Sequence, residues 1–237
     1  ILSYSAGSTS LDPFKFRVIE AQKPTDKMSR LASIFPDLQP FFVDPSQSLV
    51  VDAYPAALGG MDAMTRVITY LHPPTCIRAL RLATAEKRRV VFIAQPLAGA
   101  DLLLQAMDTQ MDWPSELLWA TGGYPLPASL QSSVEAWLAE RGCRLTVLQA
   151  YGVAELDHTL MASMHRDSES RPIYQLIDPR LELDARDDGC SLNKHIRFQG
   201  TRTANHDRIE SCGDGYRIHG NPPLYCDGAL RWLDEWQ

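Results

Sequence analysis

The sequence lacks long hydrophobic stretches and an excess of basic residues. Its longest apolar runs, such as Val90 to Ala94, are far too short to span a bilayer, and no signal-peptide pattern is visible. The net charge is −6 and the pI is near 5.5, whereas non-specific nucleic-acid binding requires a basic face. These absences predict a protein with no membrane and no nucleic-acid partner.

Paired cysteines are lacking as well. The cysteines number five, an odd count, and they are scattered without any CxxC spacing: Cys76, Cys143, Cys190, Cys212 and Cys226. This distribution predicts reduced thiols in a cytoplasmic protein and argues against a zinc site.

The composition is that of an ordinary globular protein. The chain has 237 residues, of which 45% are hydrophobic and 22% charged, so it can bury a sizeable core. It does not begin with methionine and opens on core-like sequence. We therefore expect a fragment of a longer protein or a trimmed form.

The most informative stretch runs from Leu117 to Glu155. An apolar strand over 117–120 stops at a glycine pair, and apolar residues then recur at helical spacing over 130–138. Gly142 ends this helix, and a second apolar strand over 145–148 leads into a loop with Tyr151 and Glu155. In parallel α/β sheets ligands bind at the carboxyl ends of strands, which is where these unusual residues fall.

The same alternation extends toward the N-terminus. Strands are expected over 49–53 and 90–94, and helices over 27–35, 75–85 and 99–107. A further helix is expected from Met61 to about Leu71. The repeated pattern predicts an α/β fold, a mostly parallel helix-covered sheet over residues 1–167.

The remaining residues have a different character. Short strands over 173–177, 195–198 and 216–219 alternate with turns at 187–189 and 213–215. This predicts a small β-rich subdomain over residues 168–237.

A small, hydroxyl-rich loop precedes the predicted sheet. Residues 5–10 include Gly7, Ser8 and Thr9, and Lys15 follows. Backbone amides, hydroxyls and a lysine can together bind an anion, although a plain solvent loop has the same composition.

Four stretches resemble motifs of the acyl-adenylate-forming superfamily, which includes acyl-CoA synthetases, aryl-CoA ligases and peptide-synthetase adenylation domains. GGYPL at 122–126 and YGVAE at 151–155 resemble the family's GGxPL and YGxTE signatures. Residues 5–15 resemble its phosphate loop, and residues 202–221 resemble its RTGD…DGYLxIxGR segment. The resemblance covers nearly the whole chain but only the middle of a family member.

The resemblance implies roles for individual residues. The adenine pocket would be formed by Gly122, Gly123, Tyr124, Tyr151 and Gly152, with Tyr151 stacked on the base. Glu155 would bind Mg²⁺, a role that suits a carboxylate beside phosphate oxygens. Asn205 would bind the ribose, the phosphates would lie on Gly7, Ser8, Thr9 and Lys15, and the acyl group would lie against Tyr54, Gly60 and Met61.

The sequence departs from the family at several of these positions. Ala154 replaces a threonine that touches phosphate, Asn205 replaces the ribose-binding aspartate, and Ser10 replaces a glycine of the phosphate loop. The family's catalytic lysine lies on a C-terminal domain that this sequence does not include.

The implied function is ATP-dependent activation of a small carboxylic acid to an acyl adenylate, with ATP or AMP and Mg²⁺ as cofactors. CoA or a carrier protein would accept the acyl group. Given the departures, we expect the chain alone to be partial or impaired as an enzyme. The alternative is a non-catalytic binding or interaction module derived from the same fold.

Overall fold

The chain forms two compact units in the computed structural model. One unit, here the parallel unit, comprises Lys23–Gln149, and the other, here the antiparallel unit, comprises Ile1–Gln22 and Ala150–Gln237. The structure describes residues 2–4, 16–18, 27–53, 64–153, 158–177, 181–183, 192–198 and 201–219. Our division of the chain between residues 167 and 168 stays a prediction.

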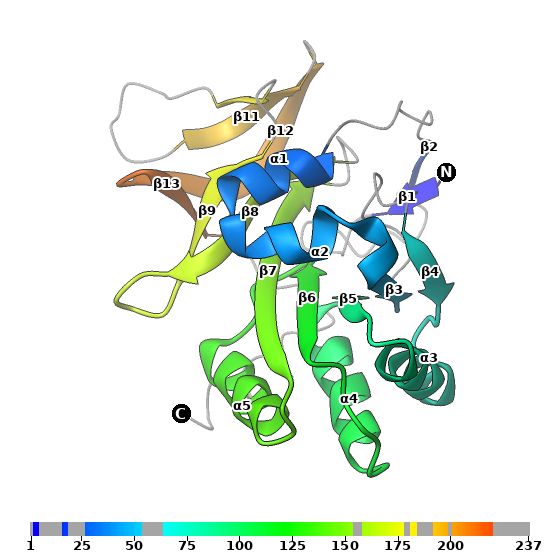
Figure 1. The fold of residues 1–237 in the computed structure, drawn as a ribbon. Helices are drawn as coiled ribbons and strands as arrows, with labels where there is room; N and C mark the ends of the chain where they lie inside the picture. The colour runs from blue at the N-terminus through cyan, green and yellow to red at the C-terminus, as the bar shows by residue number, and fades with distance from the viewer. Residues whose placement is uncertain are drawn as a thin grey trace. The chain divides into compact units, whose positions relative to one another are not determined.

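The parallel unit is a sheet with helices on it, which confirms the predicted α/β fold (Figure 1). Its strand order is β4-β3-β5-β6-β7, and the pairs β3/β4, β3/β5 and β5/β6 are parallel. The strands are β3 (Ser48–Asp52), β4 (Thr65–Ile68), β5 (Arg89–Ile93), β6 (Glu116–Gly122) and β7 (Arg144–Val153), which continues into the antiparallel unit. The helices are α1 (Lys27–Ile34), α2 (Gln39–Phe42), α3 (Pro73–Ala85), α4 (Pro96–Met107) and α5 (Ala128–Ala139), with short 3-10 turns at Pro36–Leu38 and Pro45–Gln47.

Proline and glycine set the ends of these helices. Pro73 and Pro96 occupy the first turns of α3 and α4, where the missing backbone N–H costs nothing. Gly142 lies just after α5 at φ +71°, a left-handed conformation that glycine adopts without strain. The helices predicted over 75–85, 99–107 and 130–138 are therefore confirmed, and each begins two or three residues earlier than predicted.

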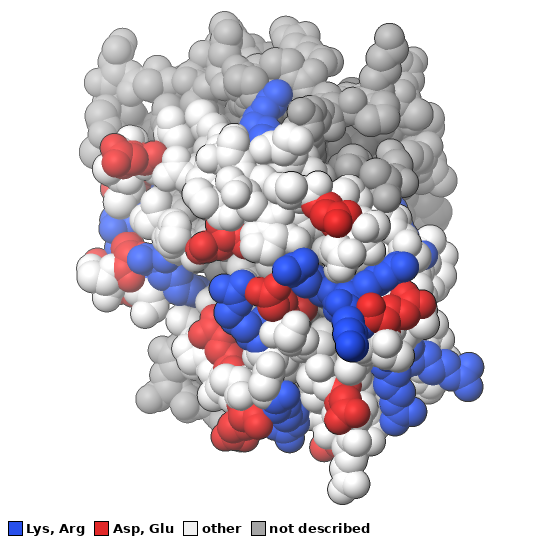
Figure 2. Space-filling model, viewed as in Figure 1, with Lys and Arg blue, Asp and Glu red and all other residues white. Residues whose placement is uncertain are grey.

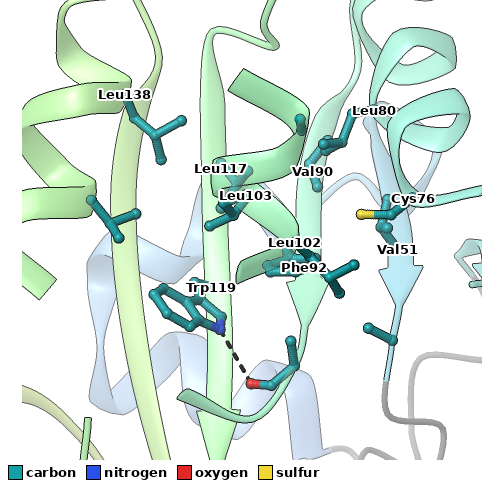
Figure 3. Close-up of a cluster of buried hydrophobic side chains, with 14 of the residues drawn as sticks. Val51, Cys76, Leu80, Val90, Phe92, Leu102, Leu103, Leu117, Trp119 and Leu138 are labelled. Atoms are coloured by element: carbon teal, nitrogen blue, oxygen red, sulfur yellow. Dashed lines mark hydrogen bonds between the residues drawn. The ribbon is translucent and has the colours of Figure 1, made fainter. Parts of the chain in front are cut away.

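The core of this unit lies between the sheet and α3, α4 and α5 (Figure 3). Every second residue of each strand faces this core, and these residues are paired across neighbouring strands: Val51 with Phe92, and Phe92 with Trp119. The strand residues between them, such as Val50 and Val91, are also buried, and α2 packs against β5. Burial on both faces explains why these strands read as continuous apolar runs rather than as alternating ones.

Trp119 is the largest of the fully buried side chains in the described residues. Its indole N–H donates to the Ala94 carbonyl at 3.2 Å, which satisfies the one polar atom of the ring. Gly99 in α4 lies directly against the ring, since a Cβ at that position would be 2.5 Å from Trp119 Cζ2. Glycine is therefore the residue that lets α4 approach the sheet here.

Ion pairs link three neighbouring strands at their first residues. Glu116 at the start of β6 forms ion pairs with Arg89 at the start of β5 and Arg144 at the start of β7. Partial burial works to raise the pKa of Glu116, but the hydrogen bonds and charges of the two arginines outweigh it and lower the pKa below its usual value. We call this group the amino-edge network.

The predicted helix from Met61 to Leu71 is wrong over residues 65–68, which form β4. Three of the four residues there, Thr65, Val67 and Ile68, are β-branched and favour a strand. Tertiary contacts fix the strand further, because Arg66 pairs with the fully buried carboxylate of Asp52 on β3 and the backbone N–H of Thr69 donates to the Asp52 carbonyl at 2.8 Å.

The antiparallel unit contains a meandering sheet and a separate pair of short strands. Its sheet order is β8-β9-β13-β12-β11-β10, and β1 (Leu2–Tyr4) pairs with β2 (Phe16–Val18). The sheet strands are β8 (His158–Arg166), β9 (Pro172–Leu176), β10 (Leu181–Leu183), β11 (Leu192–Phe198), β12 (Thr201–Cys212) and β13 (Gly215–His219). The strands predicted at 173–177, 195–198 and 216–219 and the turn at 213–215 are confirmed, whereas the turn predicted at 187–189 lies outside the described residues.

One carboxylate organises the hairpin between β8 and β9. Asp167 accepts backbone hydrogen bonds from Glu169 and Arg171 and forms ion pairs with Arg171 and with Arg217 of β13. The hydrogen bond from the Arg171 backbone is the main cause that lowers the pKa of Asp167 to about 2. The hairpin is thereby held to β13.

The described residues carry surface charges of both signs. Figure 2 shows acidic and basic side chains interspersed on the face it draws. No helix within the described ranges is long and apolar enough to cross a membrane.

Candidate functional site

The glycine turn after β6 lies at the carboxyl end of the parallel strands. Gly122 ends β6, and Gly123 follows with φ +94°, a conformation that side chains rarely adopt. A Cβ on Gly123 would also lie 3.3 Å from the side-chain nitrogen of Gln95. The turn therefore depends on glycine at residue 123, which leaves an exposed stretch of backbone without a side chain above it.

Tyr124 secures one side of this turn. Its side chain is buried, and its hydroxyl accepts a hydrogen bond from the backbone N–H of Leu97 at 3.1 Å. Leu97 lies in the first turn of α4, where backbone N–H groups have no partner within the helix, and Gln95 at the N-cap provides no side-chain cap. The Tyr124 hydroxyl thus acts as the cap of α4 and fastens the turn to that helix.

Gln149 secures the other side. Its side-chain oxygen accepts a hydrogen bond at 3.0 Å from the backbone N–H of Leu126, and both residues are buried. Gln149 belongs to β7, so the glycine turn is fastened to α4 at Tyr124 and to β7 at Leu126. A turn held at two points presents its backbone in one conformation, which reduces the ordering cost of binding a ligand.

A buried hydroxyl lies beside the turn. Thr121, the last residue before the glycine pair, is 3% exposed, and its hydroxyl has no hydrogen-bond partner within the described part of the chain. A buried hydroxyl without a partner costs about 1–3 kcal/mol, and such groups in native proteins call for an explanation. At the carboxyl edge of a parallel sheet, a bound ligand or an ordered water is the partner expected.

The second motif begins inside a strand rather than in a loop, which corrects our prediction for Tyr151 and Gly152. β7 runs to Val153 because its backbone pairing continues past the apolar residues 145–148 that defined the strand in the sequence. Tyr151 is half-buried, and its ring lies in an edge-type contact with Tyr174, with ring centroids 6.3 Å apart and planes at 65°. Gly152 is exposed.

Asn205 lies in an irregular part of β12. Ala204 is paired with His195 and Arg208 with Asn193, so residues 205–207 lie opposite Lys194 alone. Extra residues of this kind interrupt the strand pairing, and they are frequent next to functional sites. Asp207 belongs to the same three residues.

Eight predicted site residues lie outside the described residues, and their roles stay predictions. They are Gly7, Ser8, Thr9 and Lys15 of the phosphate loop, Tyr54, Gly60 and Met61 of the acyl wall, and the metal ligand Glu155. Among the residues that are described, no group of three or more His, Cys, Asp or Glu side chains could hold a metal ion.

Our sequence-based prediction missed Gln95, Thr121 and Gln149. Each is a polar residue at the end of an apolar strand, directly after residues 90–94, 117–120 and 145–148. Because the carboxyl ends of neighbouring parallel strands share one edge of a sheet, this repeated position was the signal that could have identified them.

With this geometry in place, the chain can be compared with known proteins. No protein-family model and no curated protein sequence matches it. Among solved structures it is similar to an open conformation of 2-hydroxyisobutyryl-CoA ligase in complex with 2-HIB-AMP and CoA, with a TM-score of 0.51 and 13% sequence identity over 83% of this chain and 52% of that chain. It is also similar to a mutant of the amide bond synthetase McbA from Marinactinospora thermotolerans, with a TM-score of 0.50 and 18% identity over 84% of this chain and 46% of that chain.

These comparisons show a shared fold. The chain shares the α/β architecture of the 2-hydroxyisobutyryl-CoA ligase and amide bond synthetase structures. It spans about half the length of the solved structures that it matches.

Proposed function

We propose that this chain is the nucleotide-binding part of an ATP-dependent, AMP-forming carboxylate ligase. The reaction would join a small carboxylic acid to AMP and release pyrophosphate, and CoA or a carrier protein would then accept the acyl group. Residues 1–167 would form the nucleotide-binding-like subdomain and residues 168–237 a small β-rich subdomain that contributes Asn205, in a cytoplasmic setting that suits scattered thiols.

The observation that carries this proposal is the clamped glycine turn. Gly123 offers exposed backbone at the carboxyl edge of a parallel sheet, held by Tyr124 and Gln149. Beside it lies the hydroxyl of Thr121, which has no hydrogen-bond partner among the residues that the structure describes. A flat base can lie against glycine backbone, and preorganised groups at strand ends are typical of nucleotide sites in α/β folds.

The proposed division of labour gives each motif one part of the nucleotide. Gly122 and Gly123 would line the adenine, Tyr151 beside Gly152 would stack on it, and Asn205 would bind the ribose. Glu155 would hold Mg²⁺ against the phosphates, a role that suits the preference of Mg²⁺ for one or two carboxylates plus phosphate oxygens. The phosphate loop of Gly7, Ser8, Thr9 and Lys15 and the acyl wall of Tyr54, Gly60 and Met61 complete the proposed site.

For the chain as it stands we propose weak nucleotide binding and little or no adenylation. Ala154 cannot supply the hydroxyl, and Asn205 cannot supply the charge, that the resembled motifs place at those positions. Each such contact is worth on the order of 1–3 kcal/mol, so losing two or three weakens ATP binding by roughly a thousandfold or more.

The test is calorimetric titration with ATP, with and without Mg²⁺, followed by pyrophosphate release across a panel of acyl and aryl acids. We expect Mg²⁺-dependent ATP binding with a dissociation constant of roughly a millimolar and slow or undetectable pyrophosphate release. Glu155→Gln should abolish the difference between ATP and MgATP. The control is Glu140→Gln, the same chemical change at a carboxylate that is 73% exposed at the end of α5.

Each contrary result identifies a different error. Micromolar binding with rapid pyrophosphate release would show that the replaced residues matter less than we infer. Unchanged Mg²⁺ dependence in Glu155→Gln would remove the metal from Glu155. If the chain binds no adenine nucleotide at all, the proposal fails and the non-catalytic interaction module becomes the better description.

A further inference from the structure

The half-buried ring of Tyr151 packs against the ring of Tyr174 within the antiparallel unit. Tyr174 of β9 is 6% exposed and belongs to a core cluster with Leu160, Met161 and Ile209, against which Tyr151 packs. The two rings have the separation and inclination of an edge-to-face pair, which prefers centroids about 4.5–7 Å apart. The core cluster thus holds the ring of Tyr174 in place, and the ring of Tyr151 packs against it.

The backbone around Tyr174 is shaped in a way that directs its side chain. Gln175 is paired with Ala162 and Ile173 with His165, so two residues of β8, Ser163 and Met164, oppose Tyr174 alone. Such a bulge re-aims the side chains beside it. The Ser163 hydroxyl donates to the His165 carbonyl at 2.8 Å and stabilises the bulge from within.

On the edge opposite β8, β9 pairs with β13, which also approaches Tyr174 closely. Tyr174 is paired with Tyr216 of β13, and a Cβ on the adjacent Gly215 would lie 2.8 Å from the Tyr174 carbonyl oxygen. β13 therefore approaches Tyr174 at a distance that glycine permits. Burial raises the pKa of Tyr174 to about 12, so its hydroxyl stays neutral and the buried ring carries no charge.

From this arrangement we propose that Tyr174 is a positioning residue for the nucleotide base: it holds the ring of Tyr151 in the orientation that accepts a stacked purine. The inference rests on the proposed function, in which Tyr151 stacks on adenine, and it adds a residue that no motif contains. A ring that is already oriented loses less conformational freedom on binding, so its partner contributes to affinity without touching the ligand.

The experiment separates the base from the phosphates. Titrations of the whole chain with AMP and with inorganic tripolyphosphate, both with Mg²⁺, are compared for the unaltered protein, Tyr174→Leu and Tyr174→Phe. Loss of the edge-to-face contact in Tyr174→Leu should weaken AMP binding about threefold to tenfold and leave tripolyphosphate binding unchanged. Tyr174→Phe keeps the ring and should bind AMP within about twofold of the unaltered protein.

Tyr216→Leu is the matched control. It removes the same atoms from a partly buried tyrosine that packs against the same cluster. It should lower stability without a selective loss of AMP binding. In a double variant, Tyr151→Leu combined with Tyr174→Leu should bind AMP no more weakly than Tyr151→Leu alone, because the contact is already gone.

A spectroscopic readout reports the position of Tyr151 directly. With 3-fluorotyrosine incorporated, the ¹⁹F resonance assigned to Tyr151 should move and broaden in Tyr174→Leu and stay in place in Tyr216→Leu. Should Tyr174→Leu not fold, Tyr174→Met replaces the ring with a flexible side chain that can fill the space.

The inference is overturned if Tyr174→Leu and Tyr216→Leu weaken AMP binding equally. It is also overturned if the position and width of the Tyr151 resonance are unchanged when the Tyr174 ring is removed. In either case the proposed function stands, because the unaltered chain still binds the nucleotide. If the unaltered chain binds neither AMP nor MgATP, the proposed function is refuted and the inference falls with it.

Discussion

Replacing Gly99 by alanine tests whether the close approach of α4 to Trp119 is as tight as the structure indicates. An added Cβ would lie 2.5, 2.7 and 2.8 Å from three atoms of the indole, Cζ2, Cε2 and Nε1. These distances are shorter than any real Cβ contact, so either the helix or the ring has to move. The ring is fully buried and its N–H donates a hydrogen bond to the Ala94 carbonyl. Moving either the ring or the helix would therefore lower the stability of the fold.

The magnitude follows from opposing terms. Alanine in place of glycine inside a helix is favourable by about 0.5–1 kcal/mol. Overpacking a core costs about 1–3 kcal/mol, and displacing the indole from Ala94 costs about 1 kcal/mol more. We expect Gly99→Ala to lower the free energy of unfolding by about 1–3 kcal/mol, opposite in sign to the effect of helix propensity alone.

The assay is urea denaturation followed by far-UV circular dichroism, since the five tryptophans of the chain would blur a fluorescence signal. Combining Gly99→Ala with Trp119→Phe should cost less than the sum of the two single changes, because the smaller ring relieves the clash. If Gly99→Ala is as stable as the unaltered protein or more so, the packing of α4 against Trp119 is looser than described here and the reasoning fails.

Two further predictions concern the clamped turn and the amino-edge network. Tyr124→Phe removes the hydroxyl that caps α4 and should lower the free energy of unfolding by about 1 kcal/mol in the same assay. The control is Tyr70→Phe, at a side chain that is 63% exposed, which should change the free energy of unfolding little. Equal effects of the two substitutions would mean that the hydrogen bond to Leu97 contributes nothing to stability. Because the pKa of Glu116 is lower in the folded state, its stabilisation is complete above its usual value of 4.5 and fades as pH falls through the lowered pKa. Glu116→Gln should therefore reduce stability at neutral pH and flatten its decline in acid, and a parallel decline in both proteins would contradict this.

The parallel unit was predictable because its strands are buried on both faces. Continuous apolar runs such as 90–94 and 117–120 have one interpretation once helices of regular period separate them, and glycines and prolines mark the helix ends. The same reasoning failed at β4, where four residues carry too little pattern. The ion pair between Arg66 and Asp52 that fixes that strand joins residues far apart in the sequence.

The site was predictable only in part, for a different physical reason. Motif resemblance predicts Gly123 and Tyr151 as site residues, because the conformational freedom of a glycine and the ring of a tyrosine are visible in single residues. It could not show that the Tyr124 hydroxyl is engaged by α4, nor that Gln149 holds Leu126, because hydrogen bonds between distant residues leave no local pattern. The bulge opposite Tyr174 was hidden for the same reason, since register belongs to a pair of strands and not to either sequence.

The amino-edge network has a consequence for how such a protein changes over evolutionary time. Glu116 and its two arginines join β5, β6 and β7 at their starts, while Gly122 and Gly123, which are proposed to line the adenine, lie where β6 ends. Selection on folding and selection on chemistry therefore act on different ends of the same strands. A replacement at the proposed site, such as alanine at residue 154 where the resembled motif has threonine, is therefore expected to leave the amino-edge network and its contribution to stability unchanged.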